Sequence, residues 1–195
     1  MPLIAALCAS QYEHMKSKTK KFNQHLYHEI EDEDLAEEYL AEALPYIGEV
    51  IMYFNGLEDD LSSILCEWFT DRTDQMGLVV MGSMAYAAKV DLLKRLCDDF
   101  HNSLGVSTLG YESIVKMLHE CARLRNMVAH ANWESMNEDA FTFVRLRISK
   151  SGLKQEYVQF TKESLIKVVE LIMETRNELN EFSERRSDIL YGRHT

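Results

Sequence analysis

The chain has 195 residues, 46% of them apolar, and carries a formal net charge of −11. This length suits one domain with a buried core and an added terminal segment, and only two prolines favour long uninterrupted helices. The negative charge argues against a nonspecific nucleic-acid binder, because phosphate affinity comes from Lys and Arg, and no apolar run is long enough to cross a bilayer.

The N-terminal region differs from the rest of the chain in its pattern. The start, MPLIAALCAS, lacks a basic region and has the bulky Leu7 before Cys8, so we interpret it as mature sequence. We expect the protein to be cytoplasmic. A cluster of lysines and then a strongly acidic stretch follow. The segments 11–30 and 33–44 look helical but weakly amphipathic. We therefore expect residues 1–44 to form an N-terminal helical extension.

Three amphipathic helices are expected to form the core. In the first, residues 46–69, apolar positions recur every three or four residues, and Pro45 suits its first turn. The second is expected over residues 81–104 and the third over 110–132, with the same spacing. We expect the cysteines within these apolar patterns to be buried free thiols in a reducing compartment: Cys66, Cys97 and Cys121.

The hydrophobic period changes after the third helix. Apolar and polar residues alternate in 141–150, a turn containing glycine follows, and a second run ends at Phe160, which predicts a β-hairpin. Thr161 suits the N-cap of a last helix. The predicted fold is mainly α: an up-and-down helical bundle over residues 45–187, with a short β-hairpin between the third and fourth core helices. We expect a flexible tail at 188–195.

The hexapeptide RNMVAH, residues 125–130, carries the most distinctive chemistry of the chain. Asn126 and His130 are four residues apart and share one helix face. Arg125 lies about 140° round the helix from His130, but its long side chain can reach back. A guanidinium can hold a phosphate, and an imidazole can exchange a proton near neutral pH. Together they can cleave a phosphodiester without a metal.

The R-N-x3-H spelling of these residues resembles the signature of the HEPN superfamily (higher eukaryotes and prokaryotes nucleotide-binding domains). That signature is R-x4–6-H, with a polar residue, often Asn, directly after the Arg. HEPN domains carry it on the third helix of a four- to five-helix bundle, which matches the helix expected to contain Arg125. Arg95 with His101, and Arg123 with His130, also fit the broad pattern, but Arg95 falls on the second helix.

The resemblance implies a metal-independent endoribonuclease that needs no cofactor and acts as a defence or toxin effector on RNA. His130 would act as general base on a ribose 2′-hydroxyl or as acid toward the leaving 5′-oxygen. Arg125 would neutralise the phosphate, and Asn126 would orient the imidazole or the phosphate. One His serves one proton-transfer role at a time, and HEPN nucleases pair two motifs across a dimer. We therefore expect a two-fold homodimer with a shared cleft.

Regulation by a partner is a further expectation, because toxins of this family act with antitoxins. In those paired with minimal nucleotidyltransferase antitoxins, a Tyr that is adenylylated often stands two residues after the motif His. This chain has Asn132 there. The resemblance still implies an antitoxin or another regulatory protein as a partner, but it does not imply that modification.

Other residues are expected to support the site. Glu58 can reach it and orient a ring nitrogen, although a solvated acidic face is the alternative. No metal site is expected, since His25 and His28 have ligand spacing but no matching carboxylate or Cys. The cations expected to contact RNA are Arg123, Arg145, Arg147 and Lys150.

Two other hypotheses stay open. In a non-catalytic HEPN-like module, the same dimer cleft would bind a nucleotide or a protein partner; the acidic balance and the missing Tyr favour this. In a plain helical scaffold, Arg125 and His130 would only cap a last turn, where cations pair with free carbonyls. The adjacent Asn, the third-helix position and the hairpin that follows favour a phosphate site.

Overall fold

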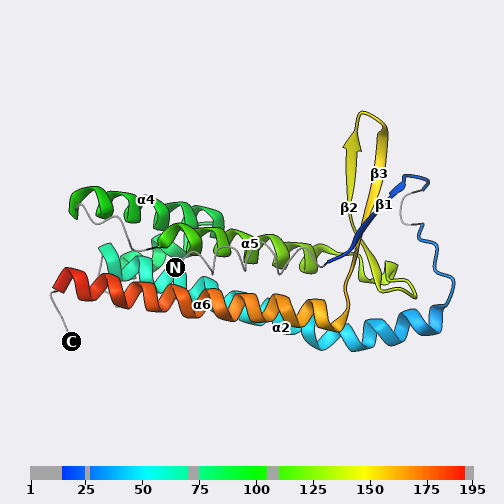
Figure 1. The fold of residues 1–195 in the computed structure, drawn as a ribbon, viewed down its shortest axis with the longest axis horizontal. Helices are drawn as coiled ribbons and strands as arrows, with labels where there is room; N and C mark the ends of the chain where they lie inside the picture. Colours follow the sequence, from blue (N-terminus) through cyan, green and yellow to red (C-terminus); the bar gives the residue numbers. More distant parts are fainter. Residues whose placement is uncertain (1–14, 25–26, 70–74, 105–109, 192–195) are drawn as a thin grey trace. The chain divides into compact units, whose positions relative to one another are not determined.

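The computed structural model describes residues 15–24, 27–69, 75–104 and 110–191, which are mainly helical with one small antiparallel sheet (Figure 1). In chain order the elements are β1 (Ser17–Lys21), α2 (Glu33–Phe69), α3 (Gln75–Ser83), α4 (Tyr86–Leu104), α5 (Tyr111–His130), the 3-10 turn η1 (Trp133–Ser135), β2 (Phe141–Ser149), β3 (Gly152–Gln159) and α6 (Lys162–Tyr191). No helix in these ranges is long and apolar enough to cross a membrane.

The chain divides into two compact units. The strand unit comprises the described residues of Met1–Ile51 and Leu124–Val169, and therefore holds the sheet and the end of α5. The helical unit comprises those of Met52–Arg123 and Glu170–Thr195. The boundary expected at residue 44 falls inside α2.

The sheet of the strand unit has the strand order β1-β3-β2, and both pairings are antiparallel. The predicted hairpin is confirmed: β2 and β3 pair from Phe141↔Gln159 to Ser149↔Gly152 around a two-residue turn. Gly152 has φ 101°, a left-handed conformation that favours glycine. The register shifts once, between Phe143 and Arg145.

The helix predicted over 11–30 is wrong in the described part of that segment, because residues 17–21 form strand β1. The reason lies in tertiary contacts. The ammonium of Lys18 lies 3.8 Å from the centre of the Phe141 ring, and that of Lys20 lies 5.7 Å from the Tyr157 ring. Contacts with aromatic rings that are distant in the sequence thus stabilise the extended conformation of this lysine-rich segment.

The prediction that a new helix starts at Pro45 is also wrong, since α2 runs through this residue without a break. The helix begins earlier, where the Asp32 carboxylate accepts a hydrogen bond of 3.0 Å from the backbone N–H of Leu35. Glu33 and Asp34 then occupy the first turn, where the helix dipole favours negative charge. A cap and an acidic first turn therefore determine the start of α2.

The remaining helices follow the predictions with three differences. The helix predicted over 81–104 is divided into α3 and α4. Thr161 is confirmed as the N-cap of α6, because its hydroxyl oxygen accepts a 3.2 Å hydrogen bond from the backbone N–H of Ser164. Residues 188–191 belong to α6 and not to a flexible tail, and 192–195 lie outside the described residues. α5 ends at His130, two residues before the predicted limit.

Polar contacts connect two pairs of helices in the helical unit. Lys89 of α4 donates to Glu58 of α2 at 2.7 Å, and the Cys121 thiol of α5 lies 3.2 Å from the hydroxyl of Thr175 on α6. The predicted buried free thiols are confirmed at Cys66, Cys97 and Cys121, whereas Cys8 lies outside the described residues. Burial raises the pKa of the Cys97 thiol to about 12, so this thiol stays protonated at neutral pH.

Replacing Pro45 by Ala is expected to stabilise α2. Proline has no N–H, so the carbonyl of Ala41 lacks its usual helical donor, and Ala restores that hydrogen bond. The free energy of unfolding should rise by up to about 3 kcal/mol, as measured by chemical denaturation.

Gly48→Ala is the matched control for Pro45→Ala, because a Cβ at this exposed position of the same helix meets nothing within 4 Å. It should add about 1 kcal/mol. Stabilisation by the Gly48 variant without stabilisation by the Pro45 variant would contradict our explanation of Pro45.

Candidate functional site

The C-terminal end of α5 is held by the connection that follows it. The indole N–H of Trp133 donates a 3.0 Å hydrogen bond to the carbonyl of Val128, one of the last carbonyls of the helix. The Trp133 ring lies 5.0 Å from that of Phe160. The backbone N–H of Asn132 donates to the carbonyl of Phe143 in β2 at 2.8 Å. The helix end is thereby tied to the sheet of the strand unit.

The three motif side chains lie on this braced helix end. Asn126 and His130 are exposed, and Arg125 is half-buried. The Arg125 guanidinium donates a 3.0 Å hydrogen bond from Nη1 to the side-chain oxygen of Asn126. This leaves the amide nitrogen of Asn126 as a donor for another group. The arrangement offers a guanidinium, an amide donor and an imidazole from one segment of helix, a set suited to binding a phosphate and moving a proton.

The cations expected to contact RNA differ in their surroundings. Arg123, in the helical unit, donates two hydrogen bonds of 2.7 and 2.6 Å to Glu120. Arg145 and Arg147 both bind Glu156, at 2.5 Å and 2.6 Å. Lys150 is exposed in the turn between β2 and β3. Three of the four cations therefore have a carboxylate partner, and their charge is partly compensated.

Glu58, the expected orienting carboxylate, accepts a hydrogen bond from Lys89 within the helical unit. Lys89 is buried, with 6% of its surface exposed, and Glu58 is half-buried. A buried ammonium needs a partner charge. The structure therefore accounts for Glu58 as the counter-charge of Lys89, a role that the sequence did not suggest.

The carboxylate of Glu156 on β3 forms ion pairs with two arginines of β2, Arg145 and Arg147. Only 7% of Glu156 is exposed. Burial by itself would raise its pKa, but hydrogen bonds from Arg147 and Arg145 outweigh burial and lower the pKa below the usual value of 4.5. Glu156 therefore stays ionised near neutral pH and joins the two arginines on one face of the sheet.

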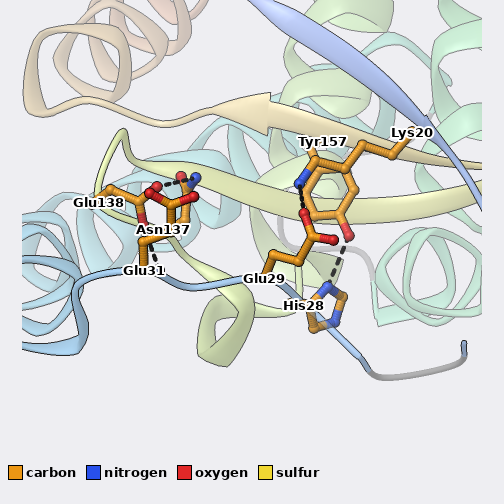
Figure 2. Close-up of polar contacts among 7 residues, drawn as sticks. All are labelled: Lys20, His28, Glu29, Glu31, Asn137, Glu138 and Tyr157. Atoms are coloured by element: carbon orange, nitrogen blue, oxygen red, sulfur yellow. Dashed lines mark hydrogen bonds and ion pairs between the residues drawn. The ribbon is translucent and has the colours of Figure 1, made fainter. Parts of the chain in front are cut away.

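A second polar cluster surrounds Tyr157, and sequence reasoning missed it (Figure 2). A ring nitrogen of His28 lies 2.9 Å from the Tyr157 hydroxyl, and Lys20 pairs with Glu29 at 3.2 Å. Burial, with a smaller effect of Glu29, raises the pKa of Tyr157. For His28 the sequence indicates only metal-ligand spacing with His25, which lies outside the described residues. No local pattern predicts a contact between residues so distant in sequence.

The same picture shows how the chain before α2 meets the turn that precedes β2 (Figure 2). The backbone N–H of Glu31 donates to the Glu138 carboxylate at 3.1 Å, and the Asn137 side chain donates to the same carboxylate at 3.3 Å. Hydrogen bonds from backbone groups, those of Glu138 and Glu31 first, lower the pKa of Glu138.

Comparison of the chain with protein-family models, curated proteins and solved structures finds no match.

Replacing Trp133 by Phe should loosen the end of α5. Phe retains a ring beside Phe160 but removes the N–H donor to the Val128 carbonyl. The expected cost is about 1 kcal/mol of unfolding free energy, and amide hydrogen exchange should accelerate in the last turn of α5. Trp68→Phe is the control, because the indole nitrogen of Trp68 is buried without a hydrogen-bond partner among the described residues. Equal exchange at the end of α5 in both variants would contradict this role of Trp133.

Replacing Glu156 by Gln should destabilise the protein near neutral pH and much less in acid. The folded-state pKa of Glu156 is lowered. Its stabilising contribution is therefore present above the unfolded pKa and is lost as the pH falls through the folded pKa. The unfolding free energies of the wild type and of Glu156→Gln are measured at neutral pH and well below the usual glutamate pKa of 4.5. The two values should differ at neutral pH and converge in acid. The control is Glu184→Gln on exposed helix surface. A destabilisation that is independent of pH would contradict this account.

Proposed function

We propose that this chain is a metal-independent endoribonuclease of HEPN type that acts in the cytoplasm as a defence or toxin effector. One observation carries the proposal: an exposed carboxamide and an exposed imidazole, Asn126 and His130, share a face at a braced helix end, and the guanidinium of Arg125 is hydrogen-bonded to that carboxamide. These groups supply phosphate binding and proton transfer within six residues.

In the proposed reaction, the ribose 2′-oxygen attacks the adjacent phosphorus and the bond from phosphorus to the 5′-oxygen breaks. The products are a 2′,3′-cyclic phosphate and a 5′-hydroxyl end. His130 takes the proton of the 2′-hydroxyl as general base. Arg125 stabilises the negative charge that grows on the phosphate. Its hydrogen bond to Asn126 supports this role, because an oriented guanidinium needs less reorganisation when the phosphate binds.

A second proton-transfer group must protonate the leaving 5′-oxygen. A single imidazole cannot accept one proton and donate another in the same step. We therefore infer that His130 of a second copy supplies that proton, in a two-fold homodimer with a shared cleft. Single-stranded loops are the expected substrates, because their backbone can adopt the in-line geometry that the attack needs.

The surface charge implies weak but selective RNA binding. The chain has a net charge of −11, and Arg123, Arg145 and Arg147 are each bonded to a carboxylate. Fewer free cations contact fewer phosphates, so affinity should depend only mildly on salt concentration. Under this proposal, Arg125 makes the main phosphate contact, and the other arginines and Lys150 contribute less.

The paired arginines also favour a second candidate function, a non-catalytic HEPN-like module that binds a nucleotide or a protein partner. A surface whose arginines are already bonded to glutamates attracts a long polyanion less than a bare basic surface does. Such a module would use the same residues to bind a small phosphate, without proton transfer by His130.

The proposal is tested by incubating a structured RNA with the wild type, Arg125→Ala and His130→Ala in the presence of EDTA. We expect the wild type to cut the RNA and leave 2′,3′-cyclic phosphate ends. Removing His130 should slow cleavage by at least about a hundredfold, the usual contribution of a general base. Arg125→Ala should also be slow, because phosphate neutralisation is lost.

His119→Ala is the matched control, since His119 is an exposed histidine of the same helix outside the motif. It should cut at the wild-type rate. Circular dichroism and the oligomeric state establish that each variant is folded and assembled. Cleavage by His130→Ala at the wild-type rate, or no cleavage by a folded wild-type dimer that binds a nucleotide, would favour the binding module.

A further inference from the structure

The two edges of the sheet differ in how well they are protected. The strand order β1-β3-β2 leaves β1 and β2 at the edges (Figure 1). β1 has five residues, SKTKK, three of them lysines, and short charged edge strands resist pairing with other chains. β2 has nine residues, and its second half includes exposed apolar side chains. β2 is therefore the edge that is more prone to pair with a strand of another chain.

The connection after α5 covers the first half of the β2 edge. Phe143 receives a hydrogen bond at its carbonyl from the N–H of Asn132 and donates its own N–H to the Ser135 hydroxyl at 2.7 Å. Phe141 is bonded on both backbone groups by Asn137, at 3.1 Å and 2.9 Å. The outward backbone groups of these two residues are therefore satisfied.

The second half of the β2 edge is open. Ser149 and Gly152 close the two-residue turn, so alternation along the strand directs the backbone groups of Leu146 and Ile148 away from β3. Within the described ranges, no strand or bridge pairs with β2 beyond Phe143 on that side. Leu146 is 41% exposed and Ile148 is 90% exposed. Unpaired backbone donors and acceptors thus lie beside exposed apolar side chains.

The opposite face of this half-strand is basic. Arg145 and Arg147 both bond the single carboxylate of Glu156, and Lys154 lies opposite Arg147 on β3. The Glu156 carboxylate accepts hydrogen bonds from Nε of both arginines and from Nη2 of Arg147. The arginine side chains are still 59% and 51% exposed, so nitrogen donors remain available. The charge of this face therefore complements acidic groups.

We propose that residues 145–149 of β2 bind an extended segment of a partner protein by strand addition, and that this segment alternates apolar and acidic residues. Its backbone pairs with the open groups of Leu146 and Ile148. Its apolar side chains cover those two residues, and its acidic side chains meet Arg145 and Arg147 on the other face. The site is separate from the motif and does not depend on the proposed nuclease activity.

Two other occupants fit this edge less well. A second copy that paired Leu146 with Ile148 in an antiparallel arrangement would place Arg147 opposite its own symmetry mate, and like charges directly opposite each other destabilise a sheet. An RNA strand would meet the arginines but has no amide groups for the strand edge and no apolar cover for Ile148. An acidic and apolar peptide satisfies all three features.

The probe is a fluorescent, capped peptide of about nine alternating Val and Glu residues, a length that spans the open half-strand. Fluorescence anisotropy with the full chain should show saturable binding. A peptide of the same composition with its Val and Glu residues in separate blocks should bind about tenfold more weakly or worse, because it cannot put the two residue types on opposite faces. Equal binding of both peptides would overturn the proposal, since charge alone would explain it.

The matched pair of variants is Ile148→Pro and Val79→Asp. Ile148→Pro removes one outward N–H of the edge and the apolar side chain, and should weaken binding about tenfold or more. Val79 is an exposed apolar residue of α3, 66% exposed, and its substitution should leave binding unchanged. Circular dichroism establishes that both variants fold.

Two further measurements, RNA binding and self-association, would identify another occupant of the β2 edge if the proposal is wrong. Tighter binding of a single-stranded RNA oligonucleotide than of the peptide, lost in Ile148→Pro, would overturn it in favour of nucleic acid. Self-association that Ile148→Pro abolishes, with no peptide binding by the wild type, would assign the edge to a second copy. Peptide binding that persists in His130→Ala, whatever that variant does to RNA, supports the proposal independently of the nuclease.

Discussion

The short connection between α5 and β2 is the constraint on which the arrangement of the strand unit depends. It must satisfy a helix end and a strand edge at once, because both leave backbone groups unpaired. Trp133 satisfies a carbonyl of the helix, and Asn132, Ser135 and Asn137 satisfy the first half of β2. Ala140 adopts a φ of 62°, an unfavourable left-handed conformation for this residue. Hydrogen bonds of its backbone with Asn137 and Phe160 hold it there.

This connection also relates the proposed active site to the proposed partner edge. The motif, residues 125–130, directly precedes this connection. The open part of β2 directly follows the part of the strand whose backbone the connection bonds. Any group at the motif is therefore presented by a helix end whose position depends on the sheet. The Arg125 guanidinium is further hydrogen-bonded to Asn126, so the proposed phosphate-binding group is oriented before a ligand arrives.

Several basic side chains of this protein are bonded to carboxylates in local ion pairs and do not form a broad basic surface. The chain has a net charge of −11, yet arginines of β2 surround Glu156 and Lys89 is bonded to Glu58. A buried or half-buried charge is tolerated only with its partner. Counting basic residues along the sequence does not reveal that Arg145 and Arg147 are paired, because their partner Glu156 lies on a neighbouring strand.

The sequence by itself determined the local structure wherever the signal is local. The helical period predicts α5, the alternation with a glycine turn predicts β2 and β3, and Thr161 predicts the start of α6. The position of the motif near the end of α5 also follows from that period, and the structure adds the hydrogen bond between Arg125 and Asn126. The role of the motif in catalysis stays a prediction.

Only the tertiary structure decided the features that depend on distant residues. β1 is extended because aromatic rings of β2 and β3 contact its lysines, and its own period did not reveal them. α2 continues through Pro45, although a lost hydrogen bond favours a boundary there, because one missing bond costs little compared with burying a long apolar face. The pairing of Glu156 and the open edge of β2 likewise follow from strand order, which no local pattern encodes.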